Sequence, residues 1–226
     1  MVYINIFERL SSYMRAMGEM KIIGLYVLLL LYSQQSLSDA LESKGFEADI
    51  VSAAIERTQH SVRYDGRYLS IPYPNGDVPA DIGVCTDVVI RTYRAIGTDL
   101  QQLVHEDMLA NFSQYPSKRI WGMNSTDKNI DHRRVPNLQV FFSRHGEKLV
   151  VSNSASDYKP GDIVTWMLPG NLPHVGLITN NVSSISNNPL VVHNIGAGPK
   201  LDDMLFSYKI TGHYRYVPSN YSESSL

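Results

Sequence analysis

The chain contains a single cysteine, Cys85, which stands where a loop rich in proline and glycine gives way to an apolar helical pattern. A thiol at a helix N-terminus meets unpaired backbone N–H groups and the positive end of the helix dipole, which lower a cysteine pKa below its usual value of about 8.5. The same N–H groups can stabilise an oxyanion. Cys85 is therefore the candidate nucleophile of a thiol-dependent reaction.

Two histidines on neighbouring predicted strands are candidates for the base that such a nucleophile requires. His174 opens the run HVGLIT, and His193 lies within LVVHNI. If these strands form a hairpin across residues 180–189, the two rings are cross-strand neighbours on one face. His174 would then take the thiol proton, and His193 would orient it through the other ring nitrogen. Because side chains alternate between faces along a strand, a slip of one residue would offer Asn194 instead.

The elements that position these residues follow from hydrophobic periodicity. Apolar residues at helical spacing predict helices over residues 47–60, 85–96 (closed by Gly97), 98 or 99 to 112, and 137–145 (ended by Gly146). The period then changes, and short apolar runs predict strands at residues 162–168, 174–179, 190–195 and 213–217. Helices followed by an antiparallel sheet define an α+β domain, with N-terminal helices packed on a C-terminal sheet.

Residues 1–38 are expected to form an N-terminal extension and signal peptide outside the folded domain. The run from Ile22 to Tyr32 carries no charge. It is shorter than the roughly 20 apolar residues of a membrane span and has the size of a secretory signal core. The small residues Ser36 and Ser38 follow it, so cleavage after Ser38 is expected. The alternative is that this run forms a hydrophobic first helix of the domain.

Cleavage there would leave one domain at residues 39–217 and a flexible tail at residues 218–226. Both Met1 and Met20 are possible translation starts. The mature protein is expected in the periplasm or outside the cell, without a stable membrane span.

Composition excludes several classes of protein. The 226 residues are 43% hydrophobic and 19% charged, which is typical of a globular protein. The formal net charge is −2 without a dominant basic block, so nucleic acid is not expected as a partner. A single cysteine excludes an internal disulfide framework and a multi-thiolate zinc site. No metal or organic cofactor is expected.

Several segments resemble known families. The runs KPGDIVTW (159–166), HVGLIT (174–179) and VVHN (191–194) resemble the sheet of NlpC-type cell-wall peptidases, a papain-like superfamily. The wording GVCTDVVIRTYRAIG, NIDHRRVPNLQVFF and HNIGAGP is similar to a bacterial family catalogued as domain of unknown function 1287, over about residues 50–217.

The resemblance to NlpC-type enzymes implies a papain-like fold, with Cys85 as nucleophile, His174 as base and His193 as the orienting residue. It also implies that Tyr73 corresponds to a tyrosine lining the oxyanion site. The sequence departs from that pattern around the cysteine. NlpC-type enzymes usually have Asp before it and Ser-Gly after it, whereas here Val84 precedes it and Thr86-Asp87 follows. These changes bear on substrate choice.

Two arginines, Arg133 and Arg134, are further candidates for substrate binding. They follow Asp131 and precede an apolar helix. A guanidinium binds a carboxylate in a bidentate manner, and peptidoglycan stem peptides carry carboxylates. The alternative is that Asp131 caps the chain locally and the arginines are solvated.

Taken together, these patterns predict a secreted thiol hydrolase that cleaves an amide bond, most readily in peptidoglycan stem peptides, through an acyl-enzyme on Cys85. One alternative is an amidase acting on another acyl or peptide substrate, such as a toxin. The other is a non-catalytic cell-wall binding module that keeps the fold.

Overall fold

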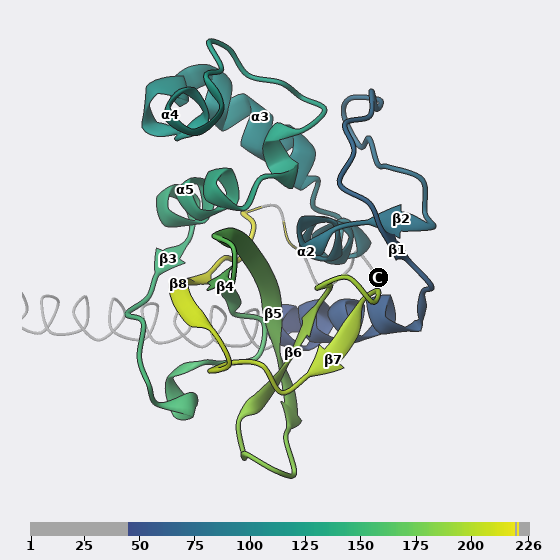
Figure 1. Ribbon diagram of the computed structural model, residues 1–226, viewed down its shortest axis with the longest axis vertical. Helices are drawn as coiled ribbons and strands as arrows, with labels where there is room; N and C mark the ends of the chain where they lie inside the picture. The colour runs from purple at the N-terminus through teal and green to yellow at the C-terminus, as the bar shows by residue number, and fades with distance from the viewer. Residues whose placement is uncertain (1–44, 220, 222–226) are drawn as a thin grey trace, which may run out of the picture. The chain divides into compact units, whose positions relative to one another are not determined.

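The computed structural model describes residues 45–219 and Tyr221 (Figure 1). The predicted signal peptide and most of the predicted tail lie outside these residues. Within the part that the structure describes, no helix has both the length and the apolar character to cross a membrane.

Helices dominate the N-terminal half of the described chain, as predicted. Residues 45–56 are helical. The other helices are α2 (Cys85–Ala95), α3 (Leu100–Asn111), α4 (Ser117–Trp121) and α5 (Val135–His145). Short 3₁₀ turns are η1 (Arg57–Gln59), η2 (Phe112–Gln114), η3 (Asp131–Arg133) and η4 (Ala155–Asp157). The four predicted helices are confirmed, whereas the short α4 was not predicted.

The ends of these helices follow from local residue chemistry. The Asp99 side chain caps α3 by accepting a hydrogen bond from the Gln101 N–H at 3.0 Å. Gly97, directly after α2, has φ +81°, a left-handed conformation that glycine adopts without a Cβ clash. Pro136 lies in the first turn of α5, where a missing N–H costs nothing.

The C-terminal half forms a six-stranded antiparallel sheet in the order β3-β8-β4-β5-β6-β7. Its strands are β3 (Glu147–Lys148), β4 (Ile163–Leu168), β5 (Leu172–Val182), β6 (Pro189–His193), β7 (Lys200–Asp202) and β8 (Lys209–Arg215). A separate parallel pair joins β1 (Arg63–Tyr64) to β2 (Ile82–Gly83). The predicted strands correspond to β4, β5, β6 and β8, and the α+β class with helices before the sheet is confirmed.

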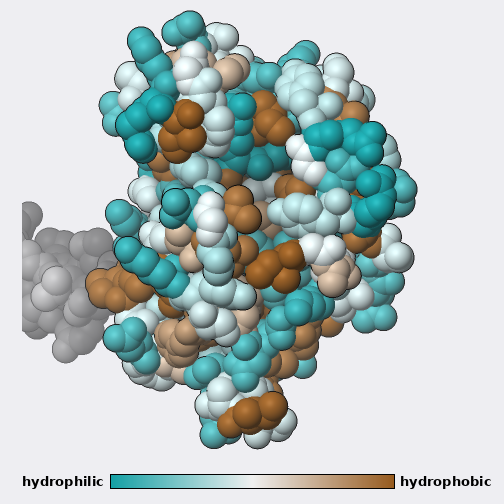
Figure 2. All heavy atoms as spheres, in the orientation of Figure 1, coloured by the Kyte–Doolittle hydropathy of each residue, from teal (hydrophilic) through white to brown (hydrophobic). Residues whose placement is uncertain are grey.

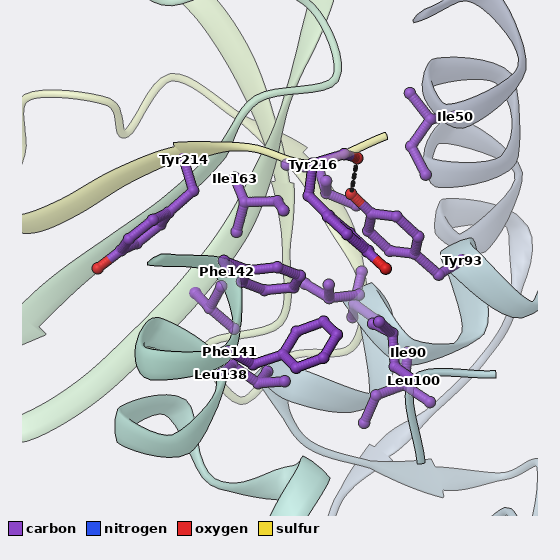
Figure 3. Close-up of a cluster of buried hydrophobic side chains, with 14 of the residues drawn as sticks. Ile50, Ile90, Tyr93, Leu100, Leu138, Phe141, Phe142, Ile163, Tyr214 and Tyr216 are labelled. Atoms are coloured by element: carbon purple, nitrogen blue, oxygen red, sulfur yellow. Dashed lines mark hydrogen bonds between the residues drawn. The ribbon is translucent and has the colours of Figure 1, made fainter. Parts of the chain in front are cut away.

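Apolar side chains cover both faces of the sheet. One face packs against α2 and α5, on which α3 packs in turn, and Figure 3 shows Tyr93, Phe141 and Phe142 gathered there. In the same cluster the Tyr93 hydroxyl donates a hydrogen bond to the Tyr216 carbonyl at 2.9 Å. The opposite face carries a smaller cluster around the fully buried Trp166. The sheet is therefore a central layer, and α2 is held against one side of it.

Tyr221 lies in the stretch expected to be a flexible tail, yet it is buried in the helix-side cluster. Its ring meets that of Phe46 edge-on with centroids 5.1 Å apart, and its hydroxyl donates to the Asp49 carboxylate. These contacts tie the C-terminal end of the described chain to its first helical segment.

Candidate active site

Cys85 is the first residue of α2 and is only 4% exposed. The backbone N–H groups of Val175 on β5, of Thr86 and of Cys85 itself favour the thiolate form and act to lower its pKa. The β5–β6 pairing extends only as far as Leu177 opposite Val192. The helix α2, which begins at Cys85, packs against both of these strands.

His174 and His193 meet as the sequence predicted. Leu177 pairs with Val192 and Ile178 with Val191 in the expected antiparallel hairpin. His174 Nε2 lies 3.0 Å from His193 Nδ1, and the two rings meet edge-on at 90°. Both side chains are almost fully buried. Since this contact uses Nε2 of His174, its Nδ1 is left to face a second partner.

Gly176 provides the room for this contact. A Cβ at this position would lie 2.7 Å from Val191 Cγ1, 2.9 Å from the Val192 carbonyl oxygen and 3.1 Å from His193 Cβ. Real Cβ atoms do not approach other atoms so closely, so a side chain here would displace β6 and its histidine. The glycine of the HVG run therefore has a steric role in the site.

Asn194, the alternative orienting residue, does not reach His174. Its Oδ1 accepts a hydrogen bond from the Gly196 N–H at 3.0 Å. It lines a small internal space with Val84 and Asp87, on the side of the start of α2. Its Nδ2 is buried and has no hydrogen-bond partner among the described residues. The structure brings His193, and not Asn194, onto His174.

Asp202 stands behind His193 and was not among the predicted site residues. Its Oδ2 lies 3.4 Å from His193 Nε2, which is ion-pair range without the alignment of a hydrogen bond. The same oxygen is 2.6 Å from Lys200 Nζ. Asp202 belongs to β7, a three-residue strand too short for periodicity to reveal.

The electrostatics of the site differ from the sequence expectation. Burial raises the pKa of the Cys85 thiol to about 11, and the backbone N–H groups of Val175, Thr86 and Cys85 offset only part of that rise. Burial also lowers the pKa of His174 to about 3, with a further contribution from His193. Burial lowers the pKa of His193 too, against the opposing effect of Asp202. The predicted lowering of the Cys85 pKa is therefore wrong for this buried thiol. At neutral pH the Cys85 thiol and the His174 imidazole are both uncharged.

Arg133 is engaged within the protein. Its Nε and Nη2 lie 2.8 and 2.9 Å from the two carboxylate oxygens of Asp87, and both side chains are at most 4% exposed. Asp87 also accepts the Val84 N–H at 2.7 Å, and the Thr86 hydroxyl donates to the Arg133 carbonyl at 3.1 Å. Arg133 therefore fixes the first turn of α2, the turn that carries Cys85.

Arg134 is held in another direction. Its Nη1 lies 3.3 Å from Asp131, and its guanidinium sits 4.1 Å from the centroid of the Trp121 ring. Neither partner belongs to α2, β5 or β6, so the contacts of Arg134 do not bring it to the cysteine and histidines.

The tyrosine that the structure associates with Cys85 is Tyr64 rather than Tyr73. Tyr73 packs against His105 with ring centroids 5.0 Å apart, and Lys128 Nζ stands 5.7 Å from its ring. Tyr64 pairs with Gly83, two residues before Cys85. Tyr64 is 44% exposed, and its partial desolvation, followed by the negative charges of a Cys85 thiolate and of Asp87, raises its pKa to about 12. The two-residue strand β1 gave no periodic signal by which Tyr64 could have been found.

No group of three or more His, Cys, Asp or Glu side chains in the described part of the chain is arranged to hold a metal ion. The groups that can do chemistry in this site are a thiol, two imidazoles, backbone N–H groups and a phenol.

Comparison with known proteins places the chain in a family. Residues 51–216 match the family described as "Domain of unknown function (DUF1287)", and the chain belongs to it. The chain is also 48% identical over 167 residues to a protein of Escherichia coli (strain K12) named "Uncharacterized protein YijF". That match covers 74% of this chain and 80% of the other protein. The resemblance to this family is confirmed, whereas the likeness to NlpC-type peptidases stays a prediction.

Proposed function

We propose that this protein is a papain-like, NlpC-type cysteine hydrolase that cleaves an amide bond in peptidoglycan stem peptides. The observation that carries the proposal is the 3.0 Å contact between His174 Nε2 and His193 Nδ1, on strands that pack against α2, the helix that begins at Cys85. In this proposal Cys85 is the nucleophile, His174 is the base and His193 orients the base, which are the three roles that thiol catalysis requires. The papain-like assignment is supported by the three strand segments that resemble those of NlpC-type peptidases and by the position of the cysteine at a helix start.

The proposed reaction begins from an uncharged thiol and imidazole. His174 Nδ1 takes the Cys85 proton as the sulfur attacks the carbonyl carbon, so that a C–S bond forms and the carbonyl oxygen becomes an oxyanion. Backbone N–H groups at the start of α2 stabilise that oxyanion. His174 returns the proton to the leaving amine as the C–N bond breaks. Water, deprotonated by His174, then hydrolyses the thioester and regenerates the thiol.

The first experiment is digestion of purified peptidoglycan, with the released muropeptides read by mass spectrometry. We expect fragments from the wild type and none from Cys85→Ala or His174→Ala. His193→Ala should lower kcat by about 100-fold, within the range typical of an orienting group in such a site. His60→Ala is the matched control, because His60 is an exposed histidine whose ring pairs with Glu56. Equal fragments from wild type and Cys85→Ala would refute the proposal.

A non-catalytic cell-wall binding module is the second candidate function, and the burial of the thiol is the observation that favours it. A thiol with a pKa of about 11 is a weak nucleophile in the closed state. Sedimentation of the wild type with peptidoglycan, without released fragments, would establish this alternative. Cleavage of a different acyl compound, also dependent on Cys85, would instead support an amidase of other specificity, such as a toxin.

A further inference from the structure

A cleft of about 730 Å³ lies away from the cysteine and histidines, between α4 and α5 on one side and β3 and β8 on the other. In Figure 1 these four elements stand along the left side of the molecule, whereas β6 and β7 form the other edge of the sheet. The cleft volume is within the roughly 300–1,000 Å³ of typical ligand sites.

The charge of this cleft has one sign. Lys118 and Arg119 of α4, Arg144 of α5 and Lys148 of β3 line it, and no carboxylate does. Arg144 is already held by Asp107, at 2.7 and 3.0 Å. The other three cations are exposed and form no ion pair with any residue between 45 and 219. A concave surface with uncompensated charge of one sign concentrates ions of the opposite sign.

Hydrogen-bonding groups also line the cleft. Gln139 and Thr211 both face it, and Gln139 Nε2 donates to the Thr211 hydroxyl at 3.2 Å and to the Thr165 hydroxyl at 2.8 Å. In Figure 2 hydrophobic side chains appear on the visible face only as small separate groups among hydrophilic ones. Amide and hydroxyl groups beside cations suit a polar, negatively charged ligand.

The strand register connects the cleft to the proposed reaction centre. Thr165 of β4, which receives the Gln139 hydrogen bond, is paired with Val175 of β5. The backbone N–H of Val175 acts to lower the pKa of Cys85. Neighbouring strands are about 4.8 Å apart, and Thr211 on the cleft-lining strand β8 is separated from Val175 on β5 by β4, which is two steps across the sheet.

We propose that this cleft binds a carboxylate-bearing peptide segment of the substrate. Two of the unpaired cations come from α4 and one from β3, so positive charge stands on both walls of the cleft, which matches negative charges spaced along a chain. The amide and hydroxyl groups between them match peptide N–H and C=O groups. The role of the cleft as a substrate subsite rests on the proposed hydrolase function, whereas binding of the carboxylate chain itself does not.

The binding test uses the full chain carrying Cys85→Ala, with hexaglutamate as the probe and hexaglutamine as the uncharged comparison. The cleft variant is Arg119→Ala/Lys148→Ala, which removes one cation from each wall. The matched control is Lys159→Ala/Lys209→Ala, which removes two exposed lysines that do not line the cleft. Calorimetry should show at least a tenfold rise in the hexaglutamate Kd for the cleft variant, about 1.4 kcal/mol, and a change of less than about twofold for the control.

Three results would overturn the proposal. Absence of hexaglutamate binding to the parent protein is the first. Equal weakening by the cleft and control pairs is the second, since it would indicate unspecific charge attraction. Tighter binding of tripolyphosphate than of hexaglutamate, with the same dependence on Arg119 and Lys148, is the third and would identify a phosphate ligand.

A kinetic arm separates this proposal from the hydrolase proposal. With Cys85 intact, Arg119→Ala/Lys148→Ala should raise KM for peptidoglycan fragments and leave kcat unchanged. If no Cys85-dependent hydrolysis is found but the cleft variant still binds hexaglutamate more weakly than the control does, the hydrolase proposal is refuted and the assignment of the cleft is retained. If hydrolysis occurs and the cleft variant keeps both KM and Kd, the cleft assignment fails alone.

Discussion

Replacing Arg133 with methionine tests how the turn that carries Cys85 is held. The substitution keeps much of the side-chain volume but removes the guanidinium that binds both carboxylate oxygens of Asp87. Asp87 then stays buried with the Val84 N–H as its remaining hydrogen-bond donor. Removing one partner of a buried ion pair costs about 3–5 kcal/mol, because the other charge loses its compensation.

This loss should appear in both chemical and thermal unfolding. We expect Arg133→Met to lower the free energy of unfolding in urea by about 3–5 kcal/mol. At about 2–4 °C per kcal/mol for a domain of this size, Tm should fall by roughly 6–20 °C. Arg63→Met is the matched control, because Arg63 also pairs with an aspartate, Asp65, but its side chain is 62% exposed. That surface pair should contribute less than about 1 kcal/mol.

The double variant Arg133→Met/Asp87→Asn completes the test, since the coupling between two residues in contact is measured by a double-mutant cycle. Its loss should be smaller than the sum of the two single losses, because no uncompensated charge is left. The reasoning is refuted if Arg133→Met destabilises the protein no more than Arg63→Met. A rise in KM for carboxylate substrates with unchanged stability would instead make Arg133 a substrate-binding residue, as the sequence suggested.

Three further predictions follow from the site. Iodoacetamide should modify Cys85 in the folded protein at pH 8 at least about 100-fold more slowly than in the urea-unfolded chain, because the folded pKa is about 11; equal rates would contradict that burial effect. Gly176→Ala should lower the free energy of unfolding in urea by about 1–3 kcal/mol and shift the NMR resonances of His193, because the added Cβ would displace β6. Unchanged stability would mean that β6 can move to accommodate a side chain without loss. His174 and His132 have folded pKa values of about 3, below the unfolded value, so the unfolded chain binds more protons in acid. Stability should be complete above about pH 6.5 and fall by about 1.4 kcal/mol per pH unit for each histidine as the pH drops toward 4.5. The raised pKa of Asp131, about 6, opposes this loss between about pH 6 and 4. His132→Gln should therefore make the slope less steep by about 1.4 kcal/mol per pH unit than that of the wild type, and an unchanged slope in the variant would contradict the prediction.

Residues whose positions follow from local periodicity were predictable from the sequence. Cys85 at a helix start and the β5–β6 hairpin both follow from repeating apolar residues interrupted by Gly, Pro and Asn. Once the hairpin is known, the alternation of faces brings His174 and His193 to the same side. The choice between His193 and Asn194 depended on register, which the structure supplies.

Residues that reach the site through non-local contacts were not predictable. Tyr64 and Asp202 lie on strands of two and three residues, and Asp87 pairs with a residue 46 positions away. No local pattern specifies such pairings. The cations of the cleft show the same limit, because Arg119 and Lys148 are far apart in sequence and line one cleft only in the folded chain.

The sign of the Cys85 pKa shift shows why position on a helix does not by itself predict reactivity. A helix N-terminus stabilises a negative charge by about 0.3–2 kcal/mol, mostly at exposed or partly buried sites. The packing that brings α2 against β5 also removes the sulfur from water, and this desolvation dominates. The same packing places α2 against β5, the strand that carries His174 and Val175. In the proposed enzyme the thiolate is therefore formed only as His174 takes the proton during attack, and the rate should depend on how substrate binding opens the site around Cys85.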